Sequence, residues 1–266
     1  MSDLLEFQSR YYAFRERAPN RSPFLHEEEG HVSLYFDFTA IQSSMRKDNP
    51  NELVVDYTQT MMGFLLFQPQ PERIAMIGLG GGSLAKYCHE FLPQAHFTAV
   101  EIHPDVIALR NEFAIPPDGD RFQVIHADGA DYVRSAAEPV DVLLIDGFDM
   151  EGQPRQLCSA GFYDHCYAKL REGGVMVVNL WDGDGKHGLY ASRIRDSFEG
   201  NAVVVDTQES GNKVAFAYKG LDFPPSLATL NERVRKLGAA HPVSLHATAQ
   251  RVQRQRPKRS SLPGIV

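Results

Sequence analysis

The chain has 266 residues, of which 43% are hydrophobic and 23% are charged. A chain of this length and composition can bury a sizeable core, as one large domain or as one large and one small domain. No apolar run approaches the length of a bilayer-spanning helix, and the first residues lack the basic lead and the unbroken apolar region of a secretory signal. We therefore expect a cytoplasmic protein with no membrane partner.

Charge is unevenly distributed along the chain, whose formal net charge is −7. The segment from Gln250 to Val266 holds five basic residues and no acidic one. The rest of the chain is strongly acidic, which suits a cationic small substrate and argues against nucleic acid as a partner. We interpret the basic segment as a solvated or disordered tail, and a short arm that binds nucleic acid is the alternative.

The three cysteines, Cys88, Cys158 and Cys166, lie in apolar or helical surroundings. We expect buried, reduced thiols rather than a disulfide framework. The run HEEEGH at 26–31 lacks the i, i+4 spacing that places two histidines on one helical face, so it indicates a turn beside a hairpin. No metal site is expected.

Short alternating runs before residue 67 predict a small antiparallel β unit, with HVSLYFDFTAI at 31–41 and a turn, EEEG, at 27–30. After that point strands and helices alternate. Predicted strands span 73–79, 96–102, 121–128, 140–148 and 174–181, and predicted helices span 83–93, 104–113, 129–137, 159–174 and 187–198. The runs at 201–207 and 213–220 predict a closing hairpin.

This order of elements predicts the fold class. Apolar strands without alternation are buried on both faces, and strand–helix alternation gives parallel pairing with right-handed crossovers. We predict an α/β fold, a doubly wound Rossmann-like sheet with an antiparallel edge and a small N-terminal β domain. The predicted divisions are a β-hairpin region at 1–66, a nucleoside-binding catalytic domain at 67–236 and a basic tail at 237–266.

Four glycines, Gly78, Gly80, Gly81 and Gly82, stand between the first strand and the first helix of this core. Amide groups point outward at such a helix start, and glycine lets a ligand approach the backbone closely. The ligand is a pyrophosphate in a dinucleotide site, and a ribose with an amino-acid-like tail in a nucleoside sulfonium site. Glu101 ends the second strand, where an acid accepts hydrogen bonds from ribose hydroxyls. Packing is the alternative reason for the glycines.

Further acids end the next strands. Asp128, followed by Gly129, stands where it can accept a hydrogen bond from an adenine amino group or cap the following helix. Asp146 and Asp149 end the fourth strand ahead of a loop long enough to act as a lid, and there they can bind a cation or deprotonate an amine. Trp181 closes the fifth strand, where it walls an acceptor pocket or packs in the core.

Five segments, in order and spacing, resemble the spermidine synthase (polyamine aminopropyltransferase) family: IAMIGLGGGSL, TAVEIHPDVIALRNEF, VIHADGADYV, VDVLLIDGFD and LCSAGFYDHCYAKLREGGVMVVNLW. The upstream run IQSSM resembles the Gln-containing strand end of that family. The likeness extends from Ser33 to Tyr218. It implies a methyltransferase-type Rossmann core, decarboxylated S-adenosylmethionine as donor, a polyamine-type amine as acceptor, and a homodimer.

The resemblance also assigns the nucleoside half of the site. Glu101 would hold the ribose hydroxyls, Asp128 and Gly129 would hold the adenine, and Gln42 would reach the nucleoside from the β domain. The glycine turn, with Gly78, Gly80 and Gly82, would line the donor.

In the amine half, Asp146 would be the catalytic acid–base residue that takes the proton from the attacking amine. Such a base is needed because an ammonium has no free lone pair. Asp149 would bind the amine chain, and Tyr57 would take the place of the family's tyrosine.

The chain also departs from the family pattern. Gly81 stands where the family has an Asp that helps to hold the aminopropyl ammonium, and we expect Gly81→Asp to improve transfer if the backbone angles tolerate a side chain. Phe38 stands in place of another Asp. Thr58 and Gln59 replace the family's His and Glu after the tyrosine. The nucleoside half of the site therefore matches the family, and the amine half is altered.

Three functions remain open from the sequence. An aminopropyltransferase is favoured by Asp146, Asp149 and the lid. A methyltransferase that uses S-adenosylmethionine on another acceptor is favoured by Gly81, because a carboxylate-bearing donor would not be held beside an Asp. A non-catalytic nucleoside-binding module is the third, and the two acids on the catalytic rim argue against it.

Overall fold

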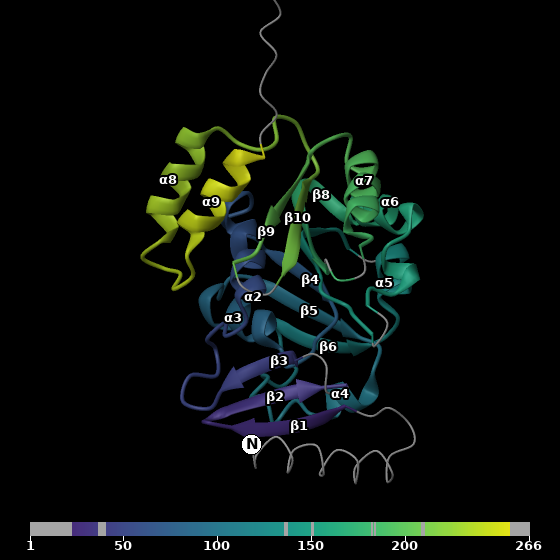
Figure 1. Ribbon diagram of the computed structural model, residues 1–266, viewed down its shortest axis with the longest axis vertical. Helices are drawn as coiled ribbons and strands as arrows, with labels where there is room; N and C mark the ends of the chain where they lie inside the picture. Colours follow the sequence, from purple (N-terminus) through teal and green to yellow (C-terminus); the bar gives the residue numbers. More distant parts are fainter. Residues whose placement is uncertain are drawn as a thin grey trace, which may run out of the picture.

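The computed structural model describes residues 23–36, 41–135, 138–149, 152–181, 183, 185–208 and 211–255. Phe38, two residues of the predicted lid (150 and 151) and the basic tail from residue 256 on lie outside the described residues. Two sheets, a small one and a large one, form the framework (Figure 1).

The small sheet comes from the N-terminal part of the chain and is antiparallel throughout. It contains β1 (Phe24–Glu28), β2 (His31–Tyr35) and β3 (Ile41–Arg46), paired in that order. Glu29 and Gly30 join β1 to β2 with φ angles of 47° and 79°. A two-residue turn with positive φ at both positions matches the right-handed twist of a hairpin. The predicted β unit is confirmed, and its turn is shorter than the predicted 27–30, because residues 27 and 28 belong to β1.

Within the described residues, the large sheet has seven strands in the order β6-β5-β4-β7-β8-β10-β9. They are β4 (Arg73–Ile77), β5 (His96–Glu101), β6 (Phe122–His126), β7 (Val140–Ile145), β8 (Leu170–Trp181), β9 (Ala202–Asp206) and β10 (Asn212–Tyr218). The strands from β4 to β8 pair in parallel, and β10 pairs antiparallel with both β8 and β9. The predicted doubly wound sheet with an antiparallel edge is therefore confirmed.

Helices cover both faces of this sheet, as Figure 1 shows. The predicted ones are α3 (Ser83–Phe91), α4 (Pro104–Ala108), α5 (Gly129–Arg134), α6 (Ala160–Lys169) and α7 (His187–Ser197). The second is shorter than predicted, because the chain after Ala108 continues as turns up to Ala114, whose φ is 50°. The fourth is also shorter, because residues 170–174 of the predicted helix belong to β8. The carbonyl of Phe113 there accepts a 2.8 Å hydrogen bond from the buried Lys86 side chain of α3.

Within the described residues, five helical segments are found that the sequence did not indicate: α2 (Asp56–Met61), the 3-10 helices η1 (Met62–Leu66) and η2 (Arg155–Leu157), α8 (Leu227–Leu237) and α9 (Leu245–Arg254). The last two pack on η1, on the side of the sheet opposite α5, α6 and α7 (Figure 1). The expectation of a solvated tail is wrong for residues 250–254, because they belong to α9, whose Val252 is fully buried. The predicted divisions at 66/67 and 236/237 stay predictions.

The cysteines and the surface complete the fold. Cys88, Cys158 and Cys166 are buried free thiols, as expected. Burial raises the pKa of the Cys88 thiol far above its ordinary value, so the thiol stays protonated. Among the described residues, no helix combines the length and the apolar character needed to cross a membrane.

Candidate active site

A cavity of about 580 Å³ opens at the carboxyl ends of the parallel strands, a size typical of small-molecule sites. It lies where the strand order reverses, because the chain runs outward from β4 to β6 and then returns to β7 on the other side of β4. Open α/β sheets leave a crevice at such a point. The small sheet and α2 complete the walls, through Gln42, Ser43 and Tyr57.

The structure gathers almost all of the predicted site residues around this cavity. Its lining includes Gln42, Tyr57, Gly78, Gly80, Glu101, Asp128, Gly129, Asp146, Asp149 and Trp181. Gly82 is the exception, since it is not among the lining residues. It is the N-cap of α3 with a φ of 66°, and a Cβ added there would meet Ile115 at 2.6 Å. Backbone conformation and packing therefore account for Gly82.

Gly78 lets two strands meet beneath the cavity. Its φ is 91°, and an added Cβ would lie 2.3 Å from the backbone oxygen of Asp146. No side chain fits in that space, because real Cβ atoms do not approach within 3.0 Å of such an atom. The glycine turn therefore brings the end of β4 directly against the end of β7, and with it the backbone of Gly78 close to Asp146.

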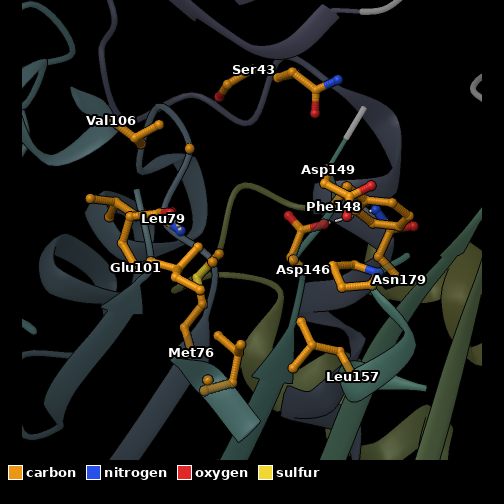
Figure 2. A pocket seen from close by; sticks show the side chains of 18 of the residues that line it. Ser43, Met76, Leu79, Glu101, Val106, Asp146, Phe148, Asp149, Leu157 and Asn179 are labelled. Atoms are coloured by element: carbon orange, nitrogen blue, oxygen red, sulfur yellow. Dashed lines mark hydrogen bonds between the residues drawn. The ribbon is translucent and has the colours of Figure 1, made fainter. Parts of the chain in front are cut away.

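Glu101 is buried, 8% exposed, at the end of β5. Its Oε2 accepts a hydrogen bond of 2.9 Å from the backbone N–H of Leu79, and its Oε1 accepts one of 2.8 Å from that of His103. The carboxylate thus fixes the glycine turn and the start of α4 at the same time. Figure 2 shows Glu101 and Leu79 on one side of the cavity, across from Asp146. Each oxygen has a second lone pair, which a ribose hydroxyl can use.

Asp128 caps α5, as one of the two interpretations of this residue predicted. Its Oδ1 accepts hydrogen bonds from the backbone N–H groups of Ala130, at 2.7 Å, and Asp131, at 3.3 Å. It also lines the cavity, so capping and adenine recognition are compatible. Gly129 follows it, and a Cβ there would meet Ile77 at 2.1 Å.

Asp146 stands at the end of β7 with both carboxylate oxygens engaged. Asn179 of β8 donates from Nδ2 to Oδ1 at 2.9 Å, and the Tyr57 hydroxyl of α2 donates to Oδ2 at 3.1 Å. Burial raises the pKa of Asp146 above its ordinary value, and the two hydrogen bonds partly offset that rise because they favour the ionised form. Burial and the neighbouring Asp146 charge raise the pKa of Tyr57 well above its ordinary value, so this phenol remains a donor.

Asp149 and Trp181 lie at the outer end of the cavity. Asp149 is exposed, and its backbone pairs with Gly152 through hydrogen bonds of 2.9 and 3.3 Å that close the loop between them. A Cβ on Gly152, whose φ is 111°, would lie 3.5 Å from the Trp181 ring. Trp181 is 44% exposed, so it belongs to the cavity wall rather than to the core.

The charge of the cavity has one sign. Four carboxylates line it, from Glu101, Asp128, Asp146 and Asp149, and none of the described lining residues is Lys, Arg or His. Such a lining attracts cations and repels anions. In the part of the chain that the structure describes, no group of three or more His, Cys, Asp or Glu side chains is placed to hold a metal ion.

Comparison with known proteins identifies the family. The family model of the spermine/spermidine synthase domain matches residues 55–182. A polyamine aminopropyltransferase of Neisseria meningitidis serogroup A is 36% identical over 241 residues, which cover 88% of this chain and 92% of the relative. The chain belongs to the polyamine aminopropyltransferase family. Members of this family are transferases, and the resemblance found in the sequence is confirmed.

One further relative and one solved structure are also similar to this chain. A polyamine aminopropyltransferase of Chromobacterium violaceum is 41% identical over 194 residues, covering 72% of this chain and 74% of the relative. The crystal structure of a probable spermidine synthase from Corynebacterium glutamicum matches with a TM-score of 0.67 and 20% identity, covering 92% of this chain and 95% of that one. At that identity the structural match supports the fold alone.

The sequence analysis missed two asparagines that line the cavity, Asn179 and Asn212. Asn179 is 2% exposed in a strand that is otherwise apolar at its buried positions. A buried amide in such a strand needs hydrogen-bond partners, so it was a detectable signal. Asn212 begins β10 and lines the cavity, but its place in the sequence, in a polar turn, gives no comparable signal.

Proposed function

We propose that this protein transfers an aminopropyl group from decarboxylated S-adenosylmethionine to a polyamine-type amine. The observation that carries the proposal is Asp146, a partly buried carboxylate held by Asn179 and Tyr57 in a cavity lined with acids and no cationic side chain among the described residues. Family membership supports the same reaction class.

The reaction joins the acceptor nitrogen to the aminopropyl carbon that is bonded to sulfur. The nitrogen lone pair forms the new C–N bond, and the C–S bond breaks with its electron pair going to sulfur, which leaves neutral methylthioadenosine. The attacking nitrogen must lose a proton, because an alkyl ammonium with a pKa of about 10 carries no lone pair at neutral pH. Asp146 would accept that proton, and its raised pKa makes it a stronger base than an exposed aspartate.

The remaining residues would bind and orient the two substrates. Glu101 would hold the ribose, Asp128 with Gly129 the adenine, and Gln42 would contact the nucleoside from the small sheet. Asp149 and Trp181, at the outer end, would hold the acceptor chain, the first by charge and the second through its ring face. Holding both reactants in line supplies much of the rate enhancement.

The cavity charge bears on the choice of donor. S-adenosylmethionine carries a carboxylate on its tail, whereas the decarboxylated donor ends in an ammonium alone. The tail carboxylate of S-adenosylmethionine would enter a cavity lined by four carboxylates and, among the described lining residues, by no cationic side chain, which favours a tail that carries the ammonium alone. Gly81, which favoured the methyltransferase alternative, removes one carboxylate but supplies no positive charge, so we keep the decarboxylated donor.

Product analysis by mass spectrometry tests the proposal. The purified protein is offered each donor with a panel of diamines and longer polyamines, beside Asp146→Asn. We expect aminopropylated product and methylthioadenosine from the decarboxylated donor only, with turnover at least about a hundredfold lower in the variant, the usual effect of removing a general base. Methyl transfer from S-adenosylmethionine without any aminopropylated amine would overturn the proposal and favour the methyltransferase. Binding of the nucleoside without transfer would favour the non-catalytic module.

The homodimer and the cytoplasmic location remain predictions from the sequence. The family resemblance supports the dimer, and analytical ultracentrifugation of the full chain would measure it. An exclusively monomeric protein at micromolar concentration would contradict it.

A further inference from the structure

Behind Asp146, on the side away from Tyr57, the hydrogen bonding continues into the edge of the sheet. The Nδ2 of Asn212, the first residue of β10, donates to the Oδ1 of Asn179 at 2.8 Å. The Nδ2 of Asn179 then donates to Asp146 at 2.9 Å. Three side chains from three adjacent strands, β10, β8 and β7, therefore form one hydrogen-bonded row.

The direction of this row is set by its last member. An ionised carboxylate has no hydrogen to donate, so Asn179 must present its amide hydrogens to Asp146. Its oxygen then faces the opposite way, and the neighbouring group must be a donor. Asn212 meets that requirement with its own amide hydrogens, which locks Asn179 in the orientation that stabilises the carboxylate.

The position of Asn212 is fixed by the fold. In the antiparallel ladder, Asn212 pairs with Trp181, and Asn179 is opposite Val214, so the two asparagines are diagonal neighbours on one face of the sheet. The backbone oxygen of Asn212 also accepts hydrogen bonds from the N–H and the hydroxyl of Thr207, at 3.1 and 2.8 Å. Asn212 is thus held by β8 and by the end of the β9–β10 hairpin, independently of any ligand.

We infer that Asn212 is a positioning residue for the transfer reaction: it acts through the amide of Asn179 to hold Asp146 as an ionised base. The inference rests on the proposed role of Asp146. Among the described residues that line the cavity, the titratable groups beside Asp146 are Tyr57 of α2 and Asp149 of the following loop, and the others are Glu101 and Asp128. Asn179 and Asn212 add no charge, so their contribution is one of orientation.

Asn212→Leu is the sharpest test, because it keeps the branched shape of the side chain, removes the donor and adds no charge. A leucine at 212 cannot donate, so the oxygen of Asn179 loses its partner and the amide can turn over and present that oxygen to Asp146. Losing the hydrogen bond that Asn179 donates disfavours the ionised form of Asp146. Asn201→Leu is the matched control, since it makes the same change at the opposite end of the β9–β10 hairpin, away from the cavity.

The measurement is a carboxyl ¹³C NMR titration of protein labelled at aspartate, with the Asp146 signal assigned by its loss in Asp146→Asn. We expect Asn212→Leu to raise the Asp146 midpoint by about one pH unit and Asn201→Leu to leave it unchanged. In an Asn179→Ala background, we expect Asn212→Leu to shift the midpoint by less than half as much, because the row is cut. An unchanged midpoint, or an equal shift in both backgrounds, would overturn the inference.

Kinetics provide the second readout and separate this inference from the proposed function. The acid limb of kcat should move upward with the NMR midpoint, so that turnover at a pH on the limb falls about tenfold in Asn212→Leu while the donor KM stays unchanged. If the NMR midpoint shifts but the wild-type protein transfers no aminopropyl group, the role of Asn212 in the hydrogen-bonded row is supported and the proposed function is refuted. Normal transfer with no shift of the limb would refute only the role of Asn212.

Discussion

Gly81 lies directly against the ring of Phe113, so that a Cβ built on the glycine would be 2.8 Å from Cδ1 of that ring and 2.6 Å from the hydroxyl of Ser43. Phe113 is fully buried, and Lys86 holds its carbonyl. The φ of Gly81 is outside the left-handed region, so its backbone would accept a side chain. The space is filled instead, which gives a physical reason why this chain has glycine where the family pattern inferred from the sequence has an aspartate.

The first prediction is that Gly81→Asp does not improve transfer, contrary to the expectation from the sequence. Gly81→Ala, which tests the space alone, should lower the free energy of unfolding by about 1–3 kcal/mol, the usual effect of overpacking. Gly119→Ala is the control, because nothing lies within 4 Å of an added Cβ there. Chemical denaturation measures both variants. Equal stability of the two variants would show that the Phe113 ring can move aside at little cost. Lack of space would then not explain the glycine at position 81.

The second prediction is that Glu101 contributes both to the stability of the unliganded protein and to ligand binding. Glu101→Ala leaves the N–H groups of Leu79 and His103 without their acceptor, which should lower the free energy of unfolding by about 1–3 kcal/mol. Binding of methylthioadenosine should weaken by about 1–3 kcal/mol as well, through the lost ribose hydrogen bonds. Thermal melts and calorimetry separate the two effects. Unchanged methylthioadenosine affinity would remove Glu101 from the ligand site but leave its structural role.

The sequence was informative where local chemistry decides the structure. The apolar strands, the glycine turn and Glu101 could be predicted because their spacing follows from one strand–turn–helix unit. Asn212 could not, since its role depends on β10 pairing antiparallel with β8, a contact between distant parts of the chain. Gly81 likewise could not be interpreted without Phe113, which comes from the irregular segment after α4.

Helix α9 was not predicted, although its pattern is local, because its basic residues favoured a solvated tail over a helix with one apolar face. Leu245, Ala249 and Val252 are buried at helical spacing beneath the basic residues. The third prediction follows: Val252→Ala should lower the free energy of unfolding by about 1–3 kcal/mol through the cavity it leaves. Gln250→Ala, on the exposed face, should have little effect. Equal denaturation midpoints for the two variants would restore the interpretation of this segment as a solvated tail.

The fourth prediction distinguishes the roles of Asp146 and Asp149, which both follow β7. Asp149 is exposed at the outer end of the cavity, so Asp149→Asn should raise the acceptor KM about tenfold, the cost of one lost ionic contact, and lower kcat much less. Asp146→Asn should lower kcat instead. Steady-state kinetics with the preferred amine measures both. A larger effect of Asp149→Asn on kcat than on KM would place that residue in the proton transfer.

The last prediction is that Asp146→Asn makes the protein more stable at neutral pH while it abolishes transfer. Burial raises the pKa of Asp146 in the folded state, so the folded protein holds this proton up to a higher pH than the unfolded chain, where an aspartate has a pKa of about 3.9. Stability is therefore lost as pH rises from the unfolded pKa through the folded one, and it stays low above that. The variant lacks this loss. An amide fits the same contacts, because its oxygen can accept from Asn179 and its NH2 can donate to Tyr57, whose hydroxyl reverses.

Denaturation curves from pH 5 to 8 measure this difference. The free energy of unfolding of Asp146→Asn should exceed that of the wild type at the upper end of this range, and the difference should narrow as pH falls. Asp149→Asn removes the same charge from an exposed site and should show no such gain. A variant less stable than the wild type at pH 8 would contradict the prediction. It would mean that the ionised carboxylate of Asp146 stabilises the folded protein and that its hydrogen bonds outweigh the cost of its burial.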